Sequence, residues 1–313
     1  EELADVDRYL AEKHRDRPDV EPIPDPAGLP GLPLATDAPP LAMLAPGFRT
    51  REIPVELPNV NNVLYRDDGT LVALAYNGDV YLLKDRDGDG FEDHAALFWE
   101  NKGRIRAPIG MDLTPSDSPH GRGVLIASKL QCLLVSDRDG DDEAESTTVI
   151  AEGWPESFQG IDACGIAWDR RDSSVYFGIG TQNFADAYDR DENDRPKFRL
   201  DGQRGVIQRI SPDFKSRTTV ATGVRFSIAL RFNERGDLFC TDQEGATWLP
   251  NGNPFDELLH IDLQNKRHYG FPPRHPKYMP DVIDEPSVFD YGPQHQSTCG
   301  LNFNVASPRG STF

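Results

Sequence analysis

Residues 225–272 contain the runs RFSIALRF (225–232), GDLFCTDQEG (236–245), DELLHI (256–261) and HYGFP (268–272). Short runs rich in aromatic and aliphatic residues alternate with turn residues, a pattern typical of short strands joined by loops. Two acidic clusters close the loops. The stretch therefore predicts one blade of a β-propeller that gathers polar side chains at one end.

Similar groups of three short strands occur four times along the chain. They recur at a spacing of roughly 50 to 70 residues, which fits propeller blades with inserted loops. A fifth group is expected to begin at Cys299–Phe303. The predicted strands of the four groups are Val60–Tyr65, Leu71–Ala75 and Val80–Leu83; Ile109–Leu113, Val124–Ala127 and Leu130–Val135; Cys164–Trp168, Val175–Ile179 and Val206–Ile210; and Ser227–Phe232, Leu238–Thr241 and Leu258–Ile261.

The region before the repeats has a different character. Residues 1–16 could form a short amphipathic helix, with Leu3, Val6 and Leu10 on one face. Proline is dense from Pro18 to Pro46, which favours an extended arm. We therefore expect an all-β fold, a β-propeller of four-stranded blades over residues 48–313, preceded by a helix and a proline-rich arm in residues 1–47.

Composition limits the classes of function. The chain has 313 residues and a net charge of −19, so its field repels phosphate backbones and nucleic acid is an unexpected partner. No apolar run is long enough to span a bilayer. The acidic charge suits a secreted protein that binds divalent cations, in the periplasm or outside the cell. None of the four cysteines forms a C-x-x-C pair, and we expect them to be buried free thiols.

The sharpest motif is DRDGDGFED at residues 85–93, called loop one here. Oxygen ligands at alternate positions can curl round a hard cation, and glycine permits the sharp turn. Position twelve of an EF-hand would be Ala96, which cannot ligate, so the pattern is the shorter nine-residue calcium loop. A metal-free acidic turn is the alternative. The predicted calcium ligands are the carboxylates of Asp85, Asp87, Asp89 and Asp93 and the carbonyl of Phe91.

A second copy is DRDGDDEAE at residues 137–145, called loop two here. Its sixth position is Asp142 instead of glycine, so we expect a less comfortable turn and weaker binding. The two loops fall at matching places in the first two blades, which strengthens both assignments. The predicted ligands are the carboxylates of Asp137, Asp139, Asp141 and Glu145 and the carbonyl of Glu143.

The order of the pieces in residues 225–272 resembles the glucose/sorbosone dehydrogenase family of quinoprotein propellers. The matching pieces are Arg225, Asp242–Gly245, Asp256-Glu257-Leu258 and Tyr269–Pro272. The style is closest to secreted propellers of planctomycete-type bacteria that are named membrane-bound dehydrogenases. Members of the wider family have six blades, so the resemblance implies that the sequence here is incomplete.

The resemblance also implies a chemistry. Family members bind pyrroloquinoline quinone (PQQ) and calcium at one end of the propeller axis and oxidise a sugar or alcohol by hydride transfer to the quinone. A c-type cytochrome or another acceptor would then take the electrons. The residues that the resemblance assigns to the cofactor are Arg225, Asp242, Glu244, Asp256, Glu257 and Tyr269.

The expected general base differs from the family pattern. The family carries a histidine before the strand that corresponds to Gly165–Trp168, whereas this chain has Gly160-Ile161-Asp162-Ala163-Cys164. Asp162 could serve as the base if burial raised its pKa. His295 looks like the family's histidine before a late blade and could line the funnel. We therefore assign Asp162 and His295 as the candidate catalytic residues.

Two other functions remain open on the sequence. A non-catalytic, calcium-stabilised propeller could bind glycans or a protein, or act as a scaffold, and the missing histidine favours it. An integrin-like calcium propeller shares the nine-residue loops, but the chain lacks that family's repeated Phe-Gly and Gly-Ala-Pro signatures.

Overall fold

Strands are the only regular elements in the part of the chain that the computed structural model describes. The described residues contain no helix that is long and apolar enough to cross a membrane. The expected helix of residues 1–16, the proline-rich arm and the boundary at residue 47 lie outside them. The described residues are 52–157, 162–181, 190–195, 197–245, 255–275, 277, 279–283, 285–292, 296–303, 306–307 and 310–311.

The first two blades are regular antiparallel sheets of four strands in sequence order. Blade one consists of β1 (Val60–Tyr65), β2 (Leu71–Ala75), β3 (Val80–Lys84) and β4 (His94–Trp99). Blade two consists of β5 (Gly110–Thr114), β6 (Arg122–Ser128), β7 (Gln131–Asp137) and β8 (Ser146–Glu152).

The next two blades depart from this pattern, because blade three has a fifth strand and blade four takes its fourth strand from beyond β16 (Arg267–His268). Blade three consists of β9 (Ala163–Trp168), β10 (Val175–Ile179), β11 (Val206–Ile210) and β12 (Arg217–Thr222), with the short β16 parallel to β12. Blade four consists of β13 (Ser227–Phe232), β14 (Leu238–Asp242), β15 (Asp256–Ile261) and β17 (Phe289–Tyr291). A separate hairpin pairs β18 (Ala306–Ser307) with β19 (Gly310–Ser311).

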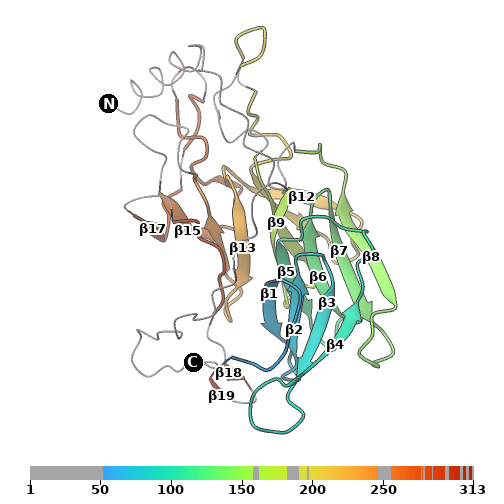
Figure 1. The fold of residues 1–313 in the computed structure, drawn as a ribbon. Coiled ribbons are helices and arrows are strands. Elements are labelled where there is room, and N and C mark those ends of the chain that lie inside the picture. The colour runs from blue at the N-terminus through green and yellow to red at the C-terminus, as the bar shows by residue number, and fades with distance from the viewer. Residues whose placement is uncertain are drawn as a thin grey trace, which may run out of the picture.

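The described residues therefore form a four-bladed β-propeller of four-stranded sheets (Figure 1). The twelve predicted strands coincide with the first three strands of each blade within a few residues. The expected fifth group is wrong in one respect, because Cys299–Phe303 does not form a strand. Cys299 is also exposed, whereas the other three cysteines are buried free thiols as expected.

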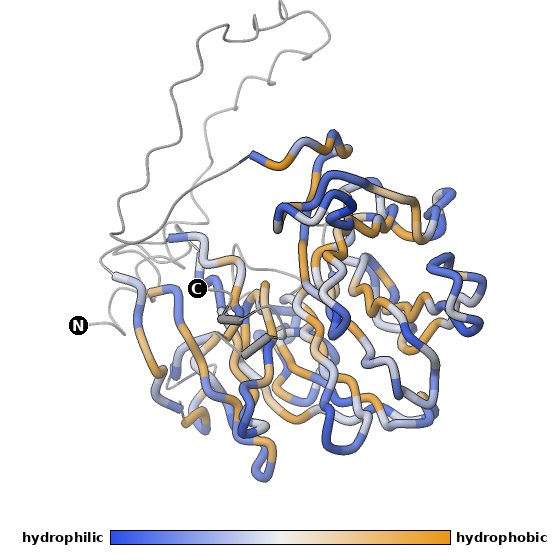
Figure 2. Tube along the Cα trace, turned by 90° about the horizontal axis from the view of Figure 1, so that it is seen from below, coloured by the Kyte–Doolittle hydropathy of each residue, from blue (hydrophilic) through white to orange (hydrophobic). Residues whose placement is uncertain are grey.

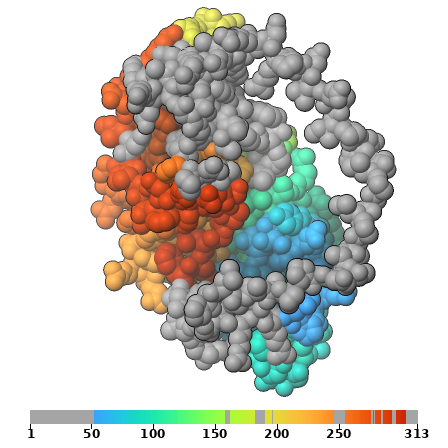
Figure 3. All heavy atoms as spheres, turned by 60° about the vertical axis from the view of Figure 1, so that its left-hand side comes forward, coloured from blue at the N-terminus to red at the C-terminus, as the bar shows by residue number. Residues whose placement is uncertain are grey.

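Apolar side chains fill the space between neighbouring blades. Separate buried clusters join blade one to blade two, blade two to blade three, and blade three to blade four. Figure 2 shows hydrophobic residues concentrated in the strands and hydrophilic residues in the turns that join them. The far face of blade one packs against Ile53, Val55 and Leu57. Figure 3 shows blades one and four on one face of the molecule.

Glycines let the first strands of adjacent blades approach closely near the axis. A Cβ at Gly110 would lie 2.1 Å from the carbonyl oxygen of Cys164 in the next blade. A Cβ at Gly165 would lie 2.7 Å from the amide nitrogen of Leu230. Because real Cβ atoms do not come this close to a backbone atom, a side chain here would push the blades apart.

Arg231 adds a polar tie between the first strands of blades two, three and four. Its Nη1 lies 2.8 Å from Asp112 Oδ1 in β5, and its Nη2 donates to the carbonyl oxygen of Met111 at 3.0 Å. The second carboxylate oxygen of Asp112 accepts the amide of Trp168 in β9 at 2.8 Å. One ion pair thus connects three blades.

Candidate functional site

The candidate residues fall at two opposite ends of the propeller. Strands alternate in direction within a blade, so the loop before its first strand and the loop between its second and third strands share one end. We call this end A. Arg225 lies just before β13, Asp242 ends β14, Asp256 begins β15 and Asp162 lies just before β9. Loops one and two each join a third strand to a fourth strand and therefore lie at the opposite end, end B.

Loop one folds around its first carboxylate. Asp85 accepts the amide of Gly88 at 2.7 Å and that of Gly90 at 2.9 Å. The carboxylates of Asp85, Asp87 and Asp89 each place an oxygen within 4.8 Å of the others. Three hard oxygen donors at this separation fit calcium, which binds six to eight such ligands. Asp93 instead accepts the amide of Arg86 at 3.0 Å.

Loop two repeats the same hydrogen bonds. Asp137 accepts the amide of Gly140 at 2.6 Å and that of Asp142 at 3.1 Å. The oxygen cluster consists of Asp137, Asp139 and Glu145, within 4.8 Å of one another. Asp141 lies outside this group and accepts the amide of Glu143 at 2.9 Å. The structure thus brings together three carboxylates in each loop.

The sixth position of each loop has a left-handed backbone. Its φ is +92° at Gly90 in loop one and +70° at Asp142 in loop two. Left-handed φ is cheap for glycine and tolerated by aspartate, so the discomfort expected at Asp142 has a structural basis. The sequence contains no sign of what offsets this cost.

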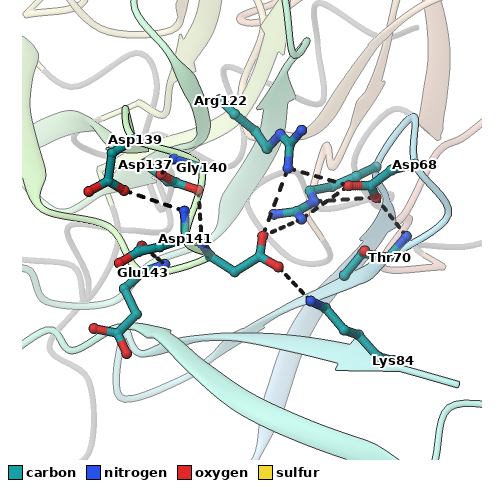
Figure 4. A network of polar contacts seen from close by, with 11 residues as sticks. Asp68, Thr70, Lys84, Arg122, Asp137, Asp139, Gly140, Asp141 and Glu143 are labelled. Atoms are coloured by element: carbon teal, nitrogen blue, oxygen red, sulfur yellow. Dashed lines mark hydrogen bonds and ion pairs between the residues drawn. The ribbon is translucent and has the colours of Figure 1, made fainter. Parts of the chain in front are cut away.

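An ion-pair network with blade one offsets the cost of the left-handed backbone at Asp142 (Figure 4). Its carboxylate lies 2.6 Å from Arg66 Nη2 and 2.5 Å from Lys84 Nζ. Arg122 Nη1 lies 3.8 Å away and also approaches Asp68 at 3.5 Å. Partial burial opposes ionisation of Asp142, but its bonds to Lys84 and Arg66 outweigh this and lower its pKa. The residue that replaces glycine in loop two therefore ties blade two to blade one.

At end A, Asp242 holds the loop that leads into β13. The carboxylate of Asp242, which has no exposed surface, accepts the amides of Arg225 at 2.8 Å and Phe226 at 2.6 Å. The guanidinium of Arg225, which is 7% exposed, donates to the carbonyl oxygen of Gln243 at 2.6 Å. A Cβ at Gly245 would lie 2.5 Å from Arg225 Nη2, so only glycine leaves room for this guanidinium.

Asp256 performs a similar role between β14 and the residues that follow blade four. One oxygen accepts the amide of Glu244 at 2.9 Å, and the other accepts the amide of Gln296 at 2.9 Å. Asp256 is fully buried. Its carboxylate therefore positions two backbone segments and would not reach a cofactor without breaking these bonds.

Burial gives end A a pair of weakened acids. Burial raises the pKa of Asp242 to about 6, although hydrogen bonds from Phe226 and Arg225 oppose the rise. Burial and the neighbouring charges of Asp242 and Glu257 raise the pKa of Glu244 well above its ordinary value. Two buried carboxyl groups that lie close together resist being ionised at the same time.

Asp162 forms a buried ion pair in the neighbouring blade. Arg204 Nη2 lies 2.6 Å from Asp162 Oδ1, which also accepts the amide of Ser157 at 3.1 Å. The two side chains are 9% and 0% exposed. Asp162 Oδ2 and Arg204 Nε are buried and have no hydrogen-bond partner among the described residues. Blade three thus presents a buried acceptor and a buried donor that could receive a ligand or water.

The two groups at end A are neighbours. The amide of Thr181, just after β10, donates to the carbonyl oxygen of Arg225 at 3.0 Å. Asp162 accepts the amide of Gly180 through its own carbonyl oxygen at 2.9 Å. The structure therefore brings Asp162, Arg225, Asp242, Glu244 and Asp256 to one end of adjacent blades.

Three predicted site residues remain: Tyr269 lies away from end A, Glu257 lies at end A, and the catalytic candidate His295 is not described. The hydroxyl of Tyr269 accepts the amide of Asp262 at 2.7 Å and donates to the carbonyl oxygen of His260 at 3.2 Å, at the far end of β15 from Asp256. Tyr269 is 2% exposed and packs in the core between blades three and four, so the structure does not bring it to the site. Glu257 pairs with Asp242 across β14 and β15. His295 lies outside the described residues.

Sequence reasoning missed Arg204 and the Asp142 network. Arg204 belongs to no motif and lies 42 residues from Asp162, so only the fold brings them together. The aspartate at position six of loop two was the single available signal for the network.

Solved structures share this fold at low sequence identity. The PQQ domain of pyranose dehydrogenase from Coprinopsis cinerea, in its holo form, has a TM-score of 0.52 and 13% identity, covering 69% of this chain and 54% of that domain. The PQQ-bound aldose sugar dehydrogenase from Streptomyces coelicolor has a TM-score of 0.53 and 16% identity, covering 71% of this chain and 65% of that enzyme. This chain therefore spans less than two thirds of each.

A calcium structure of a Trichoderma reesei carbohydrate-active enzyme of family AA12 has a TM-score of 0.57 and 15% identity. The alignment of the two structures covers 85% of this chain and 71% of that protein. These likenesses support the β-propeller fold.

No curated protein sequence matches the chain. The match to a family model covers residues 57–298, from just before blade one to just after blade four. Since this is well over half of the chain, the protein belongs to the family described as a domain of unknown function, DUF7133.

Proposed function

We propose that this protein is a calcium-stabilised propeller that binds PQQ at end A and oxidises a sugar or alcohol. The observation that carries the proposal is the convergence of two buried guanidinium groups, Arg225 and Arg204, with buried carboxyl groups at end A of blades three and four. The quinone-bound dehydrogenases that share the fold support it.

Arg225 and Arg204 would hold the anionic groups of the quinone, because a guanidinium group matches a carboxylate in shape and charge. When bound, the quinone would supply the hydride acceptor. Asp162 Oδ2 is the protein atom that we assign to accept the proton of the substrate hydroxyl. Arg204 holds the other oxygen of Asp162 at 2.6 Å and thereby fixes the carboxylate plane.

Calcium has a structural role in the proposal. Loops one and two lie at end B, away from the quinone, and each would use its three clustered carboxylates to bind one ion. The proposal includes four further predictions. The protein is secreted to the periplasm or cell exterior, and a c-type cytochrome or another acceptor takes its electrons. The intact protein has six blades and is related to planctomycete-type membrane-bound dehydrogenases.

The test is reconstitution with PQQ and calcium. We expect quenching of tryptophan fluorescence when the quinone binds, and sugar- or alcohol-dependent reduction of an artificial electron acceptor. R204M should weaken quinone binding about tenfold, as expected for a lost charge-assisted contact. R199M is the matched control, because Arg199 is exposed and pairs with the exposed Asp201. Absence of fluorescence quenching at any quinone concentration would overturn the proposal.

A non-catalytic propeller is the second candidate. One observation favours it. The carboxylate oxygens of Asp242 and Asp256 accept hydrogen bonds from backbone amides, and Asp162 forms an ion pair with Arg204. Quinone binding without acceptor reduction for any sugar or alcohol would favour this alternative.

A further inference from the structure

A small pocket of about 60 Å³ opens at end B, away from the site proposed for the quinone. Its walls come from the turns that join the first and second strands of blades one, two and three. These turns are far apart in the sequence, and the packing of the three blades brings them together. Loops one and two are at the same end, but none of their carboxylates lines the pocket.

Positive charge exceeds negative charge in the pocket wall. Three arginines line it, Arg66, Arg122 and Arg170, against two carboxylates, Asp67 and Asp68. Both carboxylates are already paired: Arg170 lies 3.0 Å from Asp67, and Arg66 and Arg122 lie 3.2 Å and 3.5 Å from Asp68. Asp142, which does not line the pocket, lies 2.6 Å from Arg66 and 3.8 Å from Arg122, and Lys84 pairs with it at 2.5 Å. The whole network thus holds four cations and three carboxylates, an excess of one positive charge in a chain with a net charge of −19.

Arg66, which lines this pocket, carries an unused donor. Its side chain is 8% exposed, and its Nη2 is shared between Asp68 and Asp142. Its Nη1 is buried and has no hydrogen-bond partner among the described residues. A buried N–H without an acceptor destabilises the folded state, so such a group points to a bound ion or water.

We infer that this pocket binds a carboxylate group, carried by a small organic acid or an acidic sugar. Guanidinium groups match the planar, bidentate shape of a carboxylate. The two aspartates in the wall leave room for one negative charge and disfavour a dianion such as phosphate. The volume holds a carboxylate and a few further atoms, so the rest of a sugar would lie outside, beside Tyr65, which is 50% exposed.

The experiment is a titration of the full chain followed by ligand-observed NMR. The ligands are acetate, galacturonate, neutral galactose and inorganic phosphate. We expect acetate and galacturonate to bind and galactose not to bind. Binding should weaken about tenfold in R170Q, because one charge-assisted contact is lost. If galacturonate binds more tightly than acetate, the ligand is an acidic sugar; equal binding indicates small acids.

The control variant is R199Q. Arg199 and Arg170 have nearly the same exposure, 68% and 69%, and each pairs with one aspartate. R199Q should bind as the unaltered protein does. R66K retains the charge and the ion pairs but removes the Nη1 donor, and should also weaken binding. Any of four results would overturn the inference. They are equal losses of affinity in R170Q and R199Q, tighter binding of phosphate than of acetate, binding of galactose, and no binding of any carboxylate.

Discussion

At the scale of single residues, the carboxylates expected to contact a cofactor mostly hold the backbone. Asp242 accepts the amides of Arg225 and Phe226, and Asp256 accepts those of Glu244 and Gln296. Backbone amides near a strand end lack a partner in the sheet, and a buried carboxylate satisfies two of them at once. The sequence motif therefore marks a rigid frame around Arg225.

The Glu244–Asp242 pair makes a pH-dependent prediction. Both have raised pKa values in the folded protein, so folding holds protons that unfolding releases. Their contribution to stability is present at low pH and is lost as the pH rises through about 6 for Asp242 and higher for Glu244. E244Q mimics the protonated acid, and its stability relative to the unaltered protein should rise between pH 5 and pH 8, by on the order of 1–2 kcal/mol.

Urea unfolding at several pH values measures this difference. E234Q is the matched control, because Glu234 is exposed and should show no such trend. A difference between E244Q and the unaltered protein that does not change with pH would contradict the raised pKa of Glu244.

At the scale of elements, loops one and two are two copies of one turn with different sixth residues. Both place their first aspartate over two backbone amides and cluster three carboxylates. Clustered carboxylates repel one another, so a bound cation should stabilise each loop. Loop two is further anchored to blade one through Asp142.

Calcium should therefore raise the melting temperature. At a concentration of 100 times its dissociation constant, a ligand stabilises the folded state by about 2.7 kcal/mol per site. D85N and D137N should each abolish the gain from one loop, and the double variant should not respond to calcium. Differential scanning calorimetry with calcium or a chelator measures the effect, and D213N, in an exposed turn, is the control. An unchanged calcium response in the double variant would refute metal binding by these loops.

At the scale of the whole molecule, the first strands of the blades carry close contacts between neighbouring blades. Gly110 and Gly165 allow backbone approach, and Arg231 ties three blades together. Asp142 links blades one and two at end B. These contacts join residues that are far apart in the sequence, so they also set the shape of end A and of the carboxylate pocket.

A methyl group near the axis should destabilise the assembly of blades. In G165A the new Cβ would meet the amide nitrogen of Leu230 at 2.7 Å, and we expect a loss of about 1–3 kcal/mol, as for other overpacked sites. G300A is the matched control, because Gly300 also follows a cysteine and has no described atom within 4 Å of its Cβ position. Urea unfolding measures both. Equal stability of G165A and the unaltered protein would show that the blades can separate there at no cost.

The strands themselves were predictable because alternating apolar runs and Gly/Asp turns depend on local physics. The same holds for the two acidic loops, whose spacing follows from the shape of a nine-residue turn. The role of Tyr269 was not predictable. Its motif placed it near Asp256 in sequence, but the length of β15 separates them, and its hydroxyl bonds to Asp262 and His260 instead.

The sequence alone determined the all-β class, the positions of the blades and the turns of the two acidic loops, because each depends on residues within one turn or one strand. Only the tertiary structure decided which charged side chains pair with one another. Arg204 with Asp162, Asp142 with Arg66 and the arginines of the end B pocket come from different hairpins. The packing of strands and neighbouring blades brings them within hydrogen-bonding distance, and sequence separation contains no measure of that distance.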